Sequence, residues 1–507
     1  MEGCIDLEQH ESAQKLQRVA TRRDVCASAT RGLDETQETA GISDAIGHRV
    51  TSSRTFLDRA LRPFTKVEPG EGAVAALMLV CAFLILSAYY VMKTVREGLI
   101  LSGGTWGLRG DELKTYATGA MAVLLVGIVP AYGLLANRVR RIRLINVSYA
   151  IVIASLGVFF VLGRAGVGVG LPFFVWLGLV SVFLIAQFWS YANDLYSEEQ
   201  GKRLFAIIAT GGALGAIVGP RIAKHAETFT LMVIAGAILL TAIALFNLID
   251  HLNARRDHDH RTTDPISGAG GFTLVLRDRY LLLIGCLLLV ANLINTTGEY
   301  VLSIAAGEHA IALVPARPDV DAAVIAAERR EVIKAFYSDF FMWVNLASFV
   351  IQAFLVSRII TKVGVRPALF VLPLVASGSY AAIAAIGGLA LIRLAKIAEN
   401  GTDYSLQNTV RQALFLPTDR VVKYKAKAAL DTFFVRAGDT MSALLVGFGI
   451  HQLGFTARNL AFINLALVTV WLATAGGIAR RHRVISNEND VAPIVTPPRL
   501  ATAGARA

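Results

Sequence analysis

The chain has 507 residues, of which 54% are hydrophobic and only 17% are charged. Because a soluble globular protein carries about 25% charged residues, this composition excludes an ordinary cytosolic enzyme, a disordered protein and a small disulfide scaffold. The net charge of +11 is typical of membrane proteins whose cytoplasmic loops are rich in Lys and Arg, and we expect no nucleic-acid partner.

The apolar residues occur in blocks of about 20, the length that a helix needs to cross a bilayer core of ~30 Å. Residues 1–70 are polar and precede the first block, so we expect a disordered cytoplasmic N-tail there and no signal peptide. The pattern predicts an all-α, polytopic membrane protein with about 12 transmembrane helices. The predicted spans are 72–94, 115–136, 143–163, 169–194, 204–222, 228–249, 279–302, 337–357, 366–386, 389–412, 428–451 and 458–479.

The distribution of Lys and Arg predicts that both termini are cytoplasmic. With that orientation, 33 of these residues lie in the inner segments and 10 lie in the outer loops. The clearest inner loop is 137–143, which contains four arginines. We assign the remaining six basic residues to the spans, whose ends are predicted to within a few residues: Lys93, Arg96, Arg393, Lys396, Arg411 and Arg436.

The spans form two halves of six, over 71–249 and 279–480, joined by a cytoplasmic linker over 250–278. Matching basic loops follow spans two and eight, and spans four and ten. Two such halves are typical of a transporter whose site lies between them near the membrane midplane. The outer loop before span eight contains a predicted solvated helix over 321–334, and residues 481–507 form a C-tail that we expect to be disordered.

Span ten carries the richest set of polar residues in the membrane. They follow one another at steps of 4, 3, 4 and 4, which places them on one stripe of a helix. They are Lys396, Asn400, Asp403, Gln407 and Arg411. Charged residues at a helix centre cost ~2.5–3.5 kcal/mol on insertion scales, so such a stripe either lines a cavity or forms an internal ladder of ion pairs.

Span one ends in a second group, in which Tyr89, Lys93 and Glu97 share a face and Arg96 lies beside them. This group either contributes to a binding site or anchors the helix at the membrane interface, where Tyr, Lys and Arg collect. Spans four, seven and eleven add further candidates. They are Gln187, Tyr191 and Asp194; Asn292, Asn295 and Glu299; and Asp431, Arg436 and Asp439. Arg436 and Asp439 are three residues apart, so they can simply pair with each other.

The remaining motifs indicate packing and not catalysis. Gly211, Gly215 and Gly219 form a smooth strip that allows another helix to approach closely. The glycines over 166–170 follow no strand, so they are not a dinucleotide fingerprint. We find no enzyme motif, and we expect no cofactor and no metal site.

Three runs of the sequence resemble the ATP/ADP translocase family, a group of nucleotide transporters found in plastids and intracellular bacteria, with relatives in free-living bacteria. They are FWSYAND at 188–194 with EQGKRLF at 199–205, YSDF at 337–340, and KYKAKAALD at 423–431. The resemblance covers about 72–480 and is strongest to the translocase-like branch of free-living bacteria. It implies a major-facilitator-like fold, since the family is distantly related to the major facilitator superfamily.

The resemblance also implies roles for single residues. The family's Lys in span one falls on Lys93, its acidic residue ending span four falls on Asp194, and its acidic residue in span seven falls on or next to Glu299. The family's Lys in span eleven falls near Asp439, with Arg436 one turn earlier. A missing cation at a phosphate site weakens nucleotide binding unless Arg436 replaces it.

The sequence therefore predicts a secondary active transporter in the inner (plasma) membrane that works by alternating access. We expect a monomer in the lipid bilayer, with ATP/ADP-type antiport of nucleotides or exchange of a related small anionic metabolite. A proton-coupled transporter of another small solute, with Glu299 or Asp403 as proton carrier, and a non-transporting membrane scaffold are the alternatives. The predicted substrate-binding residues are Tyr89, Lys93, Arg96, Tyr191, Asp194, Asn295, Glu299, Lys396, Asn400, Asp403, Gln407, Arg411 and Arg436.

Overall fold

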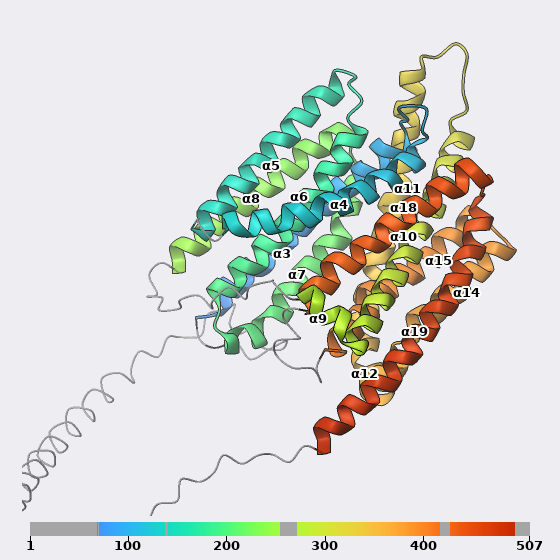
Figure 1. The fold of residues 1–507 in the computed structure, drawn as a ribbon. Helices are drawn as coiled ribbons and strands as arrows, with labels where there is room; N and C mark the ends of the chain where they lie inside the picture. The colour runs from blue at the N-terminus through green and yellow to red at the C-terminus, as the bar shows by residue number, and fades with distance from the viewer. Residues whose placement is uncertain (1–67, 69, 137–139, 254–270, 416–425, 492–507) are drawn as a thin grey trace, which may run out of the picture. The chain divides into compact units, whose positions relative to one another are not determined.

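The computed structural model describes residues 68, 70–136, 140–253, 271–415 and 426–491 (Figure 1). The predictions for the N-tail to residue 67, for most of the linker and for the basic loop at 420–425 lie outside the described residues, as does the C-tail from residue 492. By its internal contacts the chain divides into two units, Met1–Ala73 and Val74–Ala507. All the contacts discussed below belong to the second unit.

The described residues form helices and no strand, apart from one isolated bridge between Thr105 and Leu108. The all-α prediction is confirmed. The first helices are α3 (Gly72–Leu101), α4 (Gly110–Ala136), α5 (Arg141–Arg164), α6 (Gly170–Leu195), α7 (Glu198–Lys224) and α8 (Thr228–Asn253). We call these the amino-terminal helices.

The carboxy-terminal helices are more often interrupted. They are α9 (Gly271–Arg277), α10 (Arg279–Leu313), α11 (Ala322–Val350), α12 (Ser357–Lys362), α13 (Val365–Ala368), α14 (Val371–Ala385), α15 (Leu389–Thr402), α16 (Asn408–Ala413), α17 (Lys427–Ala429), α18 (Val435–Leu453) and α19 (Ala457–Val491). Three π-helical turns join some of them: η1 (Ile351–Val356), η2 (Asp403–Gln407) and η4 (Leu430–Phe434). Such turns occur frequently at functional sites.

Every predicted span falls on helix. In the part of the chain that the structure describes, nine helical segments are long and apolar enough to cross a membrane. The predicted spans at 115–136, 389–412 and 428–451 are not among the nine, so the count of twelve stays a prediction. Some helices are longer than predicted: α3 continues to Leu101 and α4 begins at Gly110, which brings the Arg96–Glu97 pair and Lys114 inside helices.

Polar caps fix where several helices begin. Ser197 and Gln200 form a capping box at the start of α7. The Asp278 carboxylate accepts hydrogen bonds from two backbone N–H groups of α10, and Asp321 does the same once for α11. Asp321 thus begins a helix that continues into the predicted span eight.

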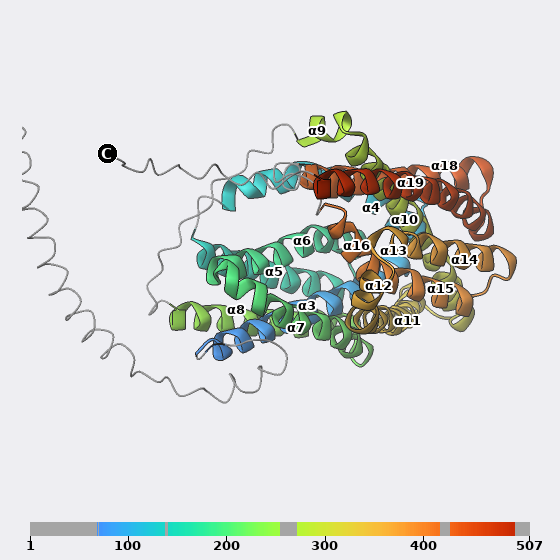
Figure 2. The ribbon, with the colours of Figure 1, turned by 90° about the horizontal axis from the view of Figure 1, so that it is seen from below.

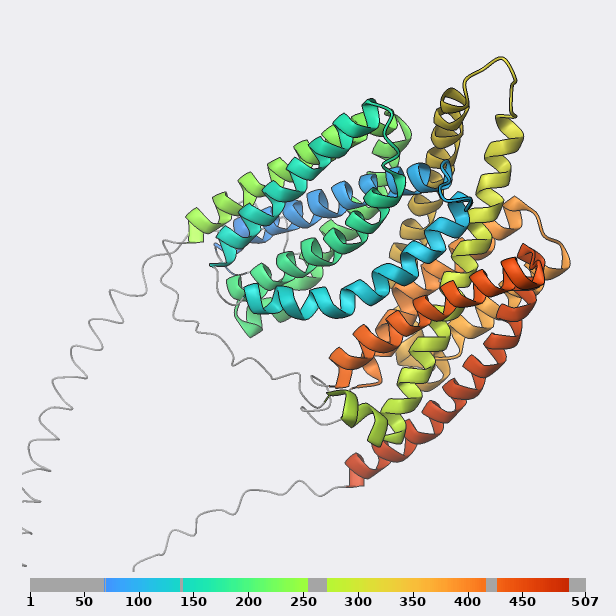
Figure 3. The ribbon, with the colours of Figure 1, turned by 45° about the horizontal axis from the view of Figure 1, so that its top comes forward.

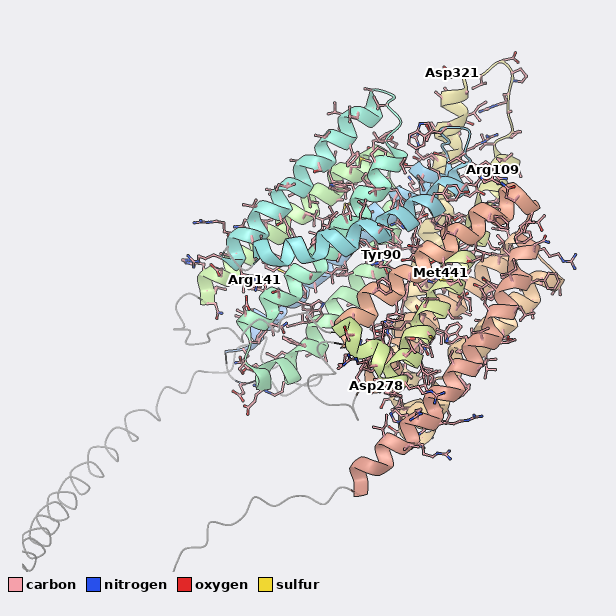
Figure 4. All side chains as sticks on the ribbon, in the orientation of Figure 1. Tyr90, Arg109, Arg141, Asp278, Asp321 and Met441 are labelled. Atoms are coloured by element: carbon pink, nitrogen blue, oxygen red, sulfur yellow. The ribbon has the colours of Figure 1, made fainter. Side chains whose placement is uncertain are left out.

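Figure 4 labels residues that mark the two ends of these helices. Arg109 precedes α4 and Asp321 precedes α11, and both lie toward one end, which we call the Arg109 end. Arg141 begins α5 and Asp278 precedes α10, and both lie toward the opposite end, the Arg141 end.

The helices pack in two sets that meet along two seams. Within the sets, α5 packs on α8 and α4 on α6, while α10 packs beside α18 and α19 (Figure 3). Between the sets, α7 runs along α11 and α4 along α18 (Figure 2). The two sets agree with the two predicted halves, whose boundaries stay a prediction.

The predicted glycine strip is confirmed as a packing surface of α7 against α3. A Cβ atom placed on Gly211 lies 2.2 Å from the Leu79 carbonyl oxygen, and one on Gly215 lies 2.3 Å from that of Phe83. Only glycine lets the two backbones approach this closely.

We expect Gly215→Ala to destabilise the protein, because the new methyl group meets backbone that cannot move without separating α3 from α7. Overpacking of this kind costs about 1–3 kcal/mol. Gly157→Ala is the matched control, since a Cβ there has nothing within 4 Å and alanine favours helix over glycine by about 0.5–1 kcal/mol. Thermal unfolding in detergent checks this prediction. We expect a lower melting temperature for Gly215→Ala and a higher one for Gly157→Ala than for the wild type. Equal melting temperatures of the two variants would contradict the close approach of α7 to α3.

Candidate functional site

A cavity of about 290 Å³ lies between the amino-terminal and carboxy-terminal helices. We call it the central cavity. Helices α3, α4 and α6 line one side of it, and α10, α11, η2 and α18 line the other. Its charged residues are Lys93, Arg96, Glu97, Lys114, Glu299, Arg436 and Asp439. Charges so placed in a membrane protein indicate a substrate or ion pathway.

The Glu97 carboxylate forms ion pairs with two of the four basic side chains of the central cavity. The carboxylate lies 2.5 Å from the Arg96 guanidinium and 2.8 Å from the Lys114 ammonium, and the Glu97 side chain is only 1% exposed. Lys114 also donates a hydrogen bond of 2.9 Å to the Ser303 hydroxyl on α10. This bond joins α4 to α10 across the two sets of helices.

Lys93 differs from the other cations of the cavity, because it forms no ion pair with any residue that the structure describes. Its ammonium group lies 4.4 Å from the centre of the Phe341 ring and 5.2 Å from that of Tyr90. Aromatic faces stabilise a cation weakly, by about 0.5–2 kcal/mol, and leave its N–H groups able to bind an anion.

Arg436 pairs with Asp439 at 3.2 Å, as the spacing on the helix allows. Asp439 also accepts hydrogen bonds from Asn292 (2.6 Å) and Thr296 (2.8 Å) on α10. Asp439 therefore connects α18 to α10. Arg436 is the basic group that α18 contributes to the central cavity.

Glu299 is tied to a buried pair behind the cavity wall. It accepts a hydrogen bond of 2.8 Å from Asn400 and lies 3.9 Å from the ammonium group of Lys396. Lys396 is fully buried and contacts Glu399 at 3.1 Å and the Asn295 side-chain oxygen at 2.9 Å. Lys396 therefore forms its ion pairs with Glu399 on its own helix and with Glu299 on α10, and not with Asn400 and Asp403 along the predicted stripe.

Eleven of the thirteen predicted site residues fall into three places. Tyr89, Lys93, Arg96, Asn295, Glu299 and Arg436 line the central cavity. Lys396 and Asn400 lie directly behind it and contact its wall. Asp403, Gln407 and Arg411 line a second, smaller cavity, to which Asn295 also contributes.

The structure does not bring Tyr191 and Asp194 to either cavity. Asp194 lies at the end of α6, 54% exposed, and pairs with Arg141 at 2.9 Å. Tyr191 is buried against Phe246, with ring centres 5.2 Å apart. Because α6 turns this face toward α5 and α8, the two residues stabilise the amino-terminal helices, and we leave them out of the proposed site.

Sequence reasoning missed Lys114 as a cavity residue. The predicted span begins at residue 115, which leaves Lys114 in an outer loop. The signal that could have identified it is the sequence of Asp111, Glu112 and Lys114 directly before an apolar block, since acidic residues favour the first turn of a helix. All three residues are buried, between 6% and 8% exposed.

No model of a known protein family matches the chain. The ADP,ATP carrier protein 1 of Chlamydia trachomatis is 22% identical over 348 residues, which are 58% of this chain and 62% of the carrier. The chloroplastic ADP,ATP carrier protein 2 of Arabidopsis thaliana is 30% identical over 101 residues, 19% of this chain and 16% of the carrier. The chain thus matches about three fifths of the length of the chlamydial carrier.

Solved structures show the same fold at low identity. The nucleoside transporter NupG superposes with a TM-score of 0.55 at 11% identity, covering 82% of this chain and 99% of NupG. A POT family transporter in complex with 5-aminolevulinic acid gives 0.57 at 14% identity, covering 80% and 96%. A bacterial homologue of the lysosomal transporter Spinster gives 0.54 at 14% identity, covering 83% and 99%. The chain has the all-helical, major-facilitator-like fold of these membrane transporters.

Proposed function

We propose that this chain is a secondary transporter that moves a small anionic substrate through the membrane by alternating access, with exchange of ATP and ADP as the first candidate reaction. The observation that carries the proposal is the excess of basic side chains in the central cavity, where Lys93, Arg96, Lys114 and Arg436 face three acidic residues. The acidic residues are Glu97, Glu299 and Asp439. The distant similarity to ADP,ATP carriers supports nucleotides as the substrate class.

The basic side chains suit a phosphate group in different ways. Lys93 offers a point charge that forms no ion pair with any described residue, and Arg96 offers a planar guanidinium that can bind two oxygens. Arg96 also lies over the Phe174 ring at 4.4 Å, which fixes the plane of its guanidinium. Tyr89, Phe341 and Tyr404 line the same cavity and provide ring faces for an apolar or aromatic part of the substrate.

Alternating access requires that the two sets of helices separate at one end and close at the other. At the Arg109 end they are joined by α7 and α11, where Lys224 pairs with Asp339 at 2.8 Å and Ser338 donates to the Pro220 carbonyl. Asn345 donates to the Ala216 carbonyl at 3.0 Å. An ion pair this exposed is worth about 0–1 kcal/mol, so these contacts can break during a transport cycle.

The experiment that tests the proposal is exchange in proteoliposomes. Vesicles that contain the purified protein and internal ADP receive labelled ATP outside, and label uptake is compared with that of vesicles without internal nucleotide. We expect uptake to require internal ADP. After an exchanger releases its substrate inside, it returns to the outward-facing state only with another substrate molecule bound. Asp194→Asn is a matched control, since this residue lies outside both cavities.

A correctly folded preparation that takes up no nucleotide would overturn nucleotide exchange. Binding of other phosphate and carboxylate anions, measured by protection of the protein against thermal unfolding, then decides whether the wider proposal of an anion transporter stands. A protein that no anion stabilises contradicts that proposal as well.

A further inference from the structure

A second cavity, of about 50 Å³, lies within the carboxy-terminal helices, between α10, α15, η2 and α19. We call it the Asp403 cavity. Its polar lining comes from Asn292, Asn295, Glu399, Asp403, Gln407 and Arg411. Since one water needs ~10–15 Å³ of such space, the cavity has room for roughly three to five waters and is too small for a metabolite.

Buried polar atoms at this cavity lack partners among the residues that the structure describes. Gln407 is 4% exposed and its side-chain oxygen accepts no hydrogen bond, and Trp471 is 2% exposed and its indole N–H donates none. The Nε of Arg411 is in the same situation. Because native proteins satisfy nearly all buried polar groups, these atoms point to a bound molecule.

The chemistry of the three atoms identifies that molecule as water. Gln407 contributes an acceptor, whereas Trp471 and Arg411 contribute donors. Water both donates and accepts, so a small cluster satisfies all three. A metal cation is repelled by the Arg411 guanidinium, and it cannot accept hydrogen bonds from the two N–H donors.

Asp403 is the carboxylate at this cavity that has no fixed partner. Of the five acidic residues that line the two cavities, the other four form ion pairs or hydrogen bonds: Glu97, Glu299, Glu399 and Asp439. Asp403 forms neither with any described residue. An unpaired carboxylate away from bulk water favours its neutral, protonated form.

The charged groups that face Asp403 come from its own segment of chain. Arg411 lies two turns later on α16, while Lys396 and Glu399 lie one to two turns earlier on α15 and are paired with each other. The other helices present only uncharged side chains to this cavity: Leu372 on α14, Val435 on α18, Trp471 on α19 and two asparagines on α10. A proton on Asp403 therefore changes the net charge of the whole cavity.

The Asp403 cavity and the central cavity share a wall. Asn292 and Asn295 line both of them. Behind this wall Lys396 binds Asn295, pairs with Glu399 of the Asp403 cavity and lies 3.9 Å from Glu299 of the central cavity. Lys396 thus contacts residues of both cavities, and it lies two turns before Asp403 on the same stretch of helix.

We infer that Asp403 is a proton-binding site, hydrated by a small water cluster, that takes up and releases a proton during the transport cycle. The proton passes between a water of the cluster and a carboxylate oxygen of Asp403, and no other bond forms or breaks. Glu299 is a poorer proton carrier, because the hydrogen bond from Asn400 and the nearby Lys396 ammonium stabilise its charged carboxylate. Proton binding stands on the geometry alone, whereas its coupling to transport rests on the proposed function.

Infrared difference spectroscopy of the purified protein in lipid, between acid and alkaline pH, tests proton binding without any substrate. We expect a carbonyl band of a protonated carboxylic acid that Asp403→Asn removes and Asp403→Glu shifts in frequency. Asp194→Asn, which changes an exposed aspartate paired with Arg141, leaves that band in place. A wild-type spectrum without such a band, or a band that survives in Asp403→Asn, overturns the inference.

The coupling is tested in proteoliposomes by the ratio of uptake with and without an imposed proton gradient. One proton per cycle allows a gradient of one pH unit to support up to about tenfold accumulation. We expect the ratio to exceed one in the wild type, to fall to one in Asp403→Asn and to recover in part in Asp403→Glu. An unchanged ratio in Asp403→Asn refutes coupling through this residue, whereas absent exchange at equal pH in the wild type instead contradicts the proposed function.

Discussion

Lys93→Ala is expected to reduce anion exchange by roughly 100-fold while the protein still reaches the membrane. Among the described residues, the Lys93 ammonium is the one cation of the central cavity that forms no ion pair, so its N–H groups can bind a phosphate without first leaving a carboxylate. Losing one partner of a buried, charged hydrogen bond costs about 2–5 kcal/mol, and 1.4 kcal/mol corresponds to a factor of ten. The measurement is exchange rate per amount of reconstituted protein.

Two further variants separate charge from structure. Lys93→Arg keeps the charge but replaces a compact ammonium by a planar fork, so we expect an intermediate rate. Lys362→Ala removes an exposed lysine at the end of α12 and is the matched control, with wild-type exchange expected. Wild-type exchange in Lys93→Ala would remove this residue from the binding site.

The fold was largely predictable because the membrane imposes it. Each apolar block of about 20 residues can only be a helix in hydrocarbon, so the twelve predicted spans all fall on helices. The same argument found Lys93 and Glu299, since a charge is kept within a span only where it meets a cavity or a partner. What the argument does not contain is which side of a helix faces its neighbours.

Lys114 and Asp194 both show that the sequence pattern does not specify which residues a side chain contacts. Lys114 looked like a loop residue, and its burial depends on Glu97 and Ser303, which come from two other helices. Asp194 looked like a site residue, but its partner is Arg141 at the start of α5. Both outcomes depend on tertiary contacts that spacing along the chain does not encode.

Span ten shows a different limit, which lies in the helix itself. An ideal helix places all five polar residues on one stripe, yet Lys396 and Asn400 reach the wall of the central cavity while Asp403 and Gln407 line the other cavity. The π-helical turn η2 over Asp403–Gln407 alters the 3.6-residue period from Asp403 onward. A sequence pattern that assumes one period cannot detect such a turn.

Glu97→Gln is expected to lower the stability of the protein by about 3–5 kcal/mol, the cost of leaving a buried charge without its partner. Arg96 and Lys114 would keep their charges, with side chains only 13% and 9% exposed, and lose the one carboxylate that both contact. An ordinary polar contact between membrane helices contributes only about 0.6 kcal/mol, so the uncompensated charge decides the size of the effect. Thermal unfolding in detergent measures it.

The double variant Glu97→Gln with Lys114→Met distinguishes this cause from a general loss of packing. Removing one of the two cations relieves the repulsion between them, so we expect the double variant to be more stable than Glu97→Gln alone. A bound anion supplies the missing negative charge, so ADP should raise the melting temperature of Glu97→Gln more than that of the wild type. Equal shifts in the two proteins would show that the substrate anion does not contact Arg96 and Lys114, and would leave Lys93 and Arg436 as the basic groups that bind it.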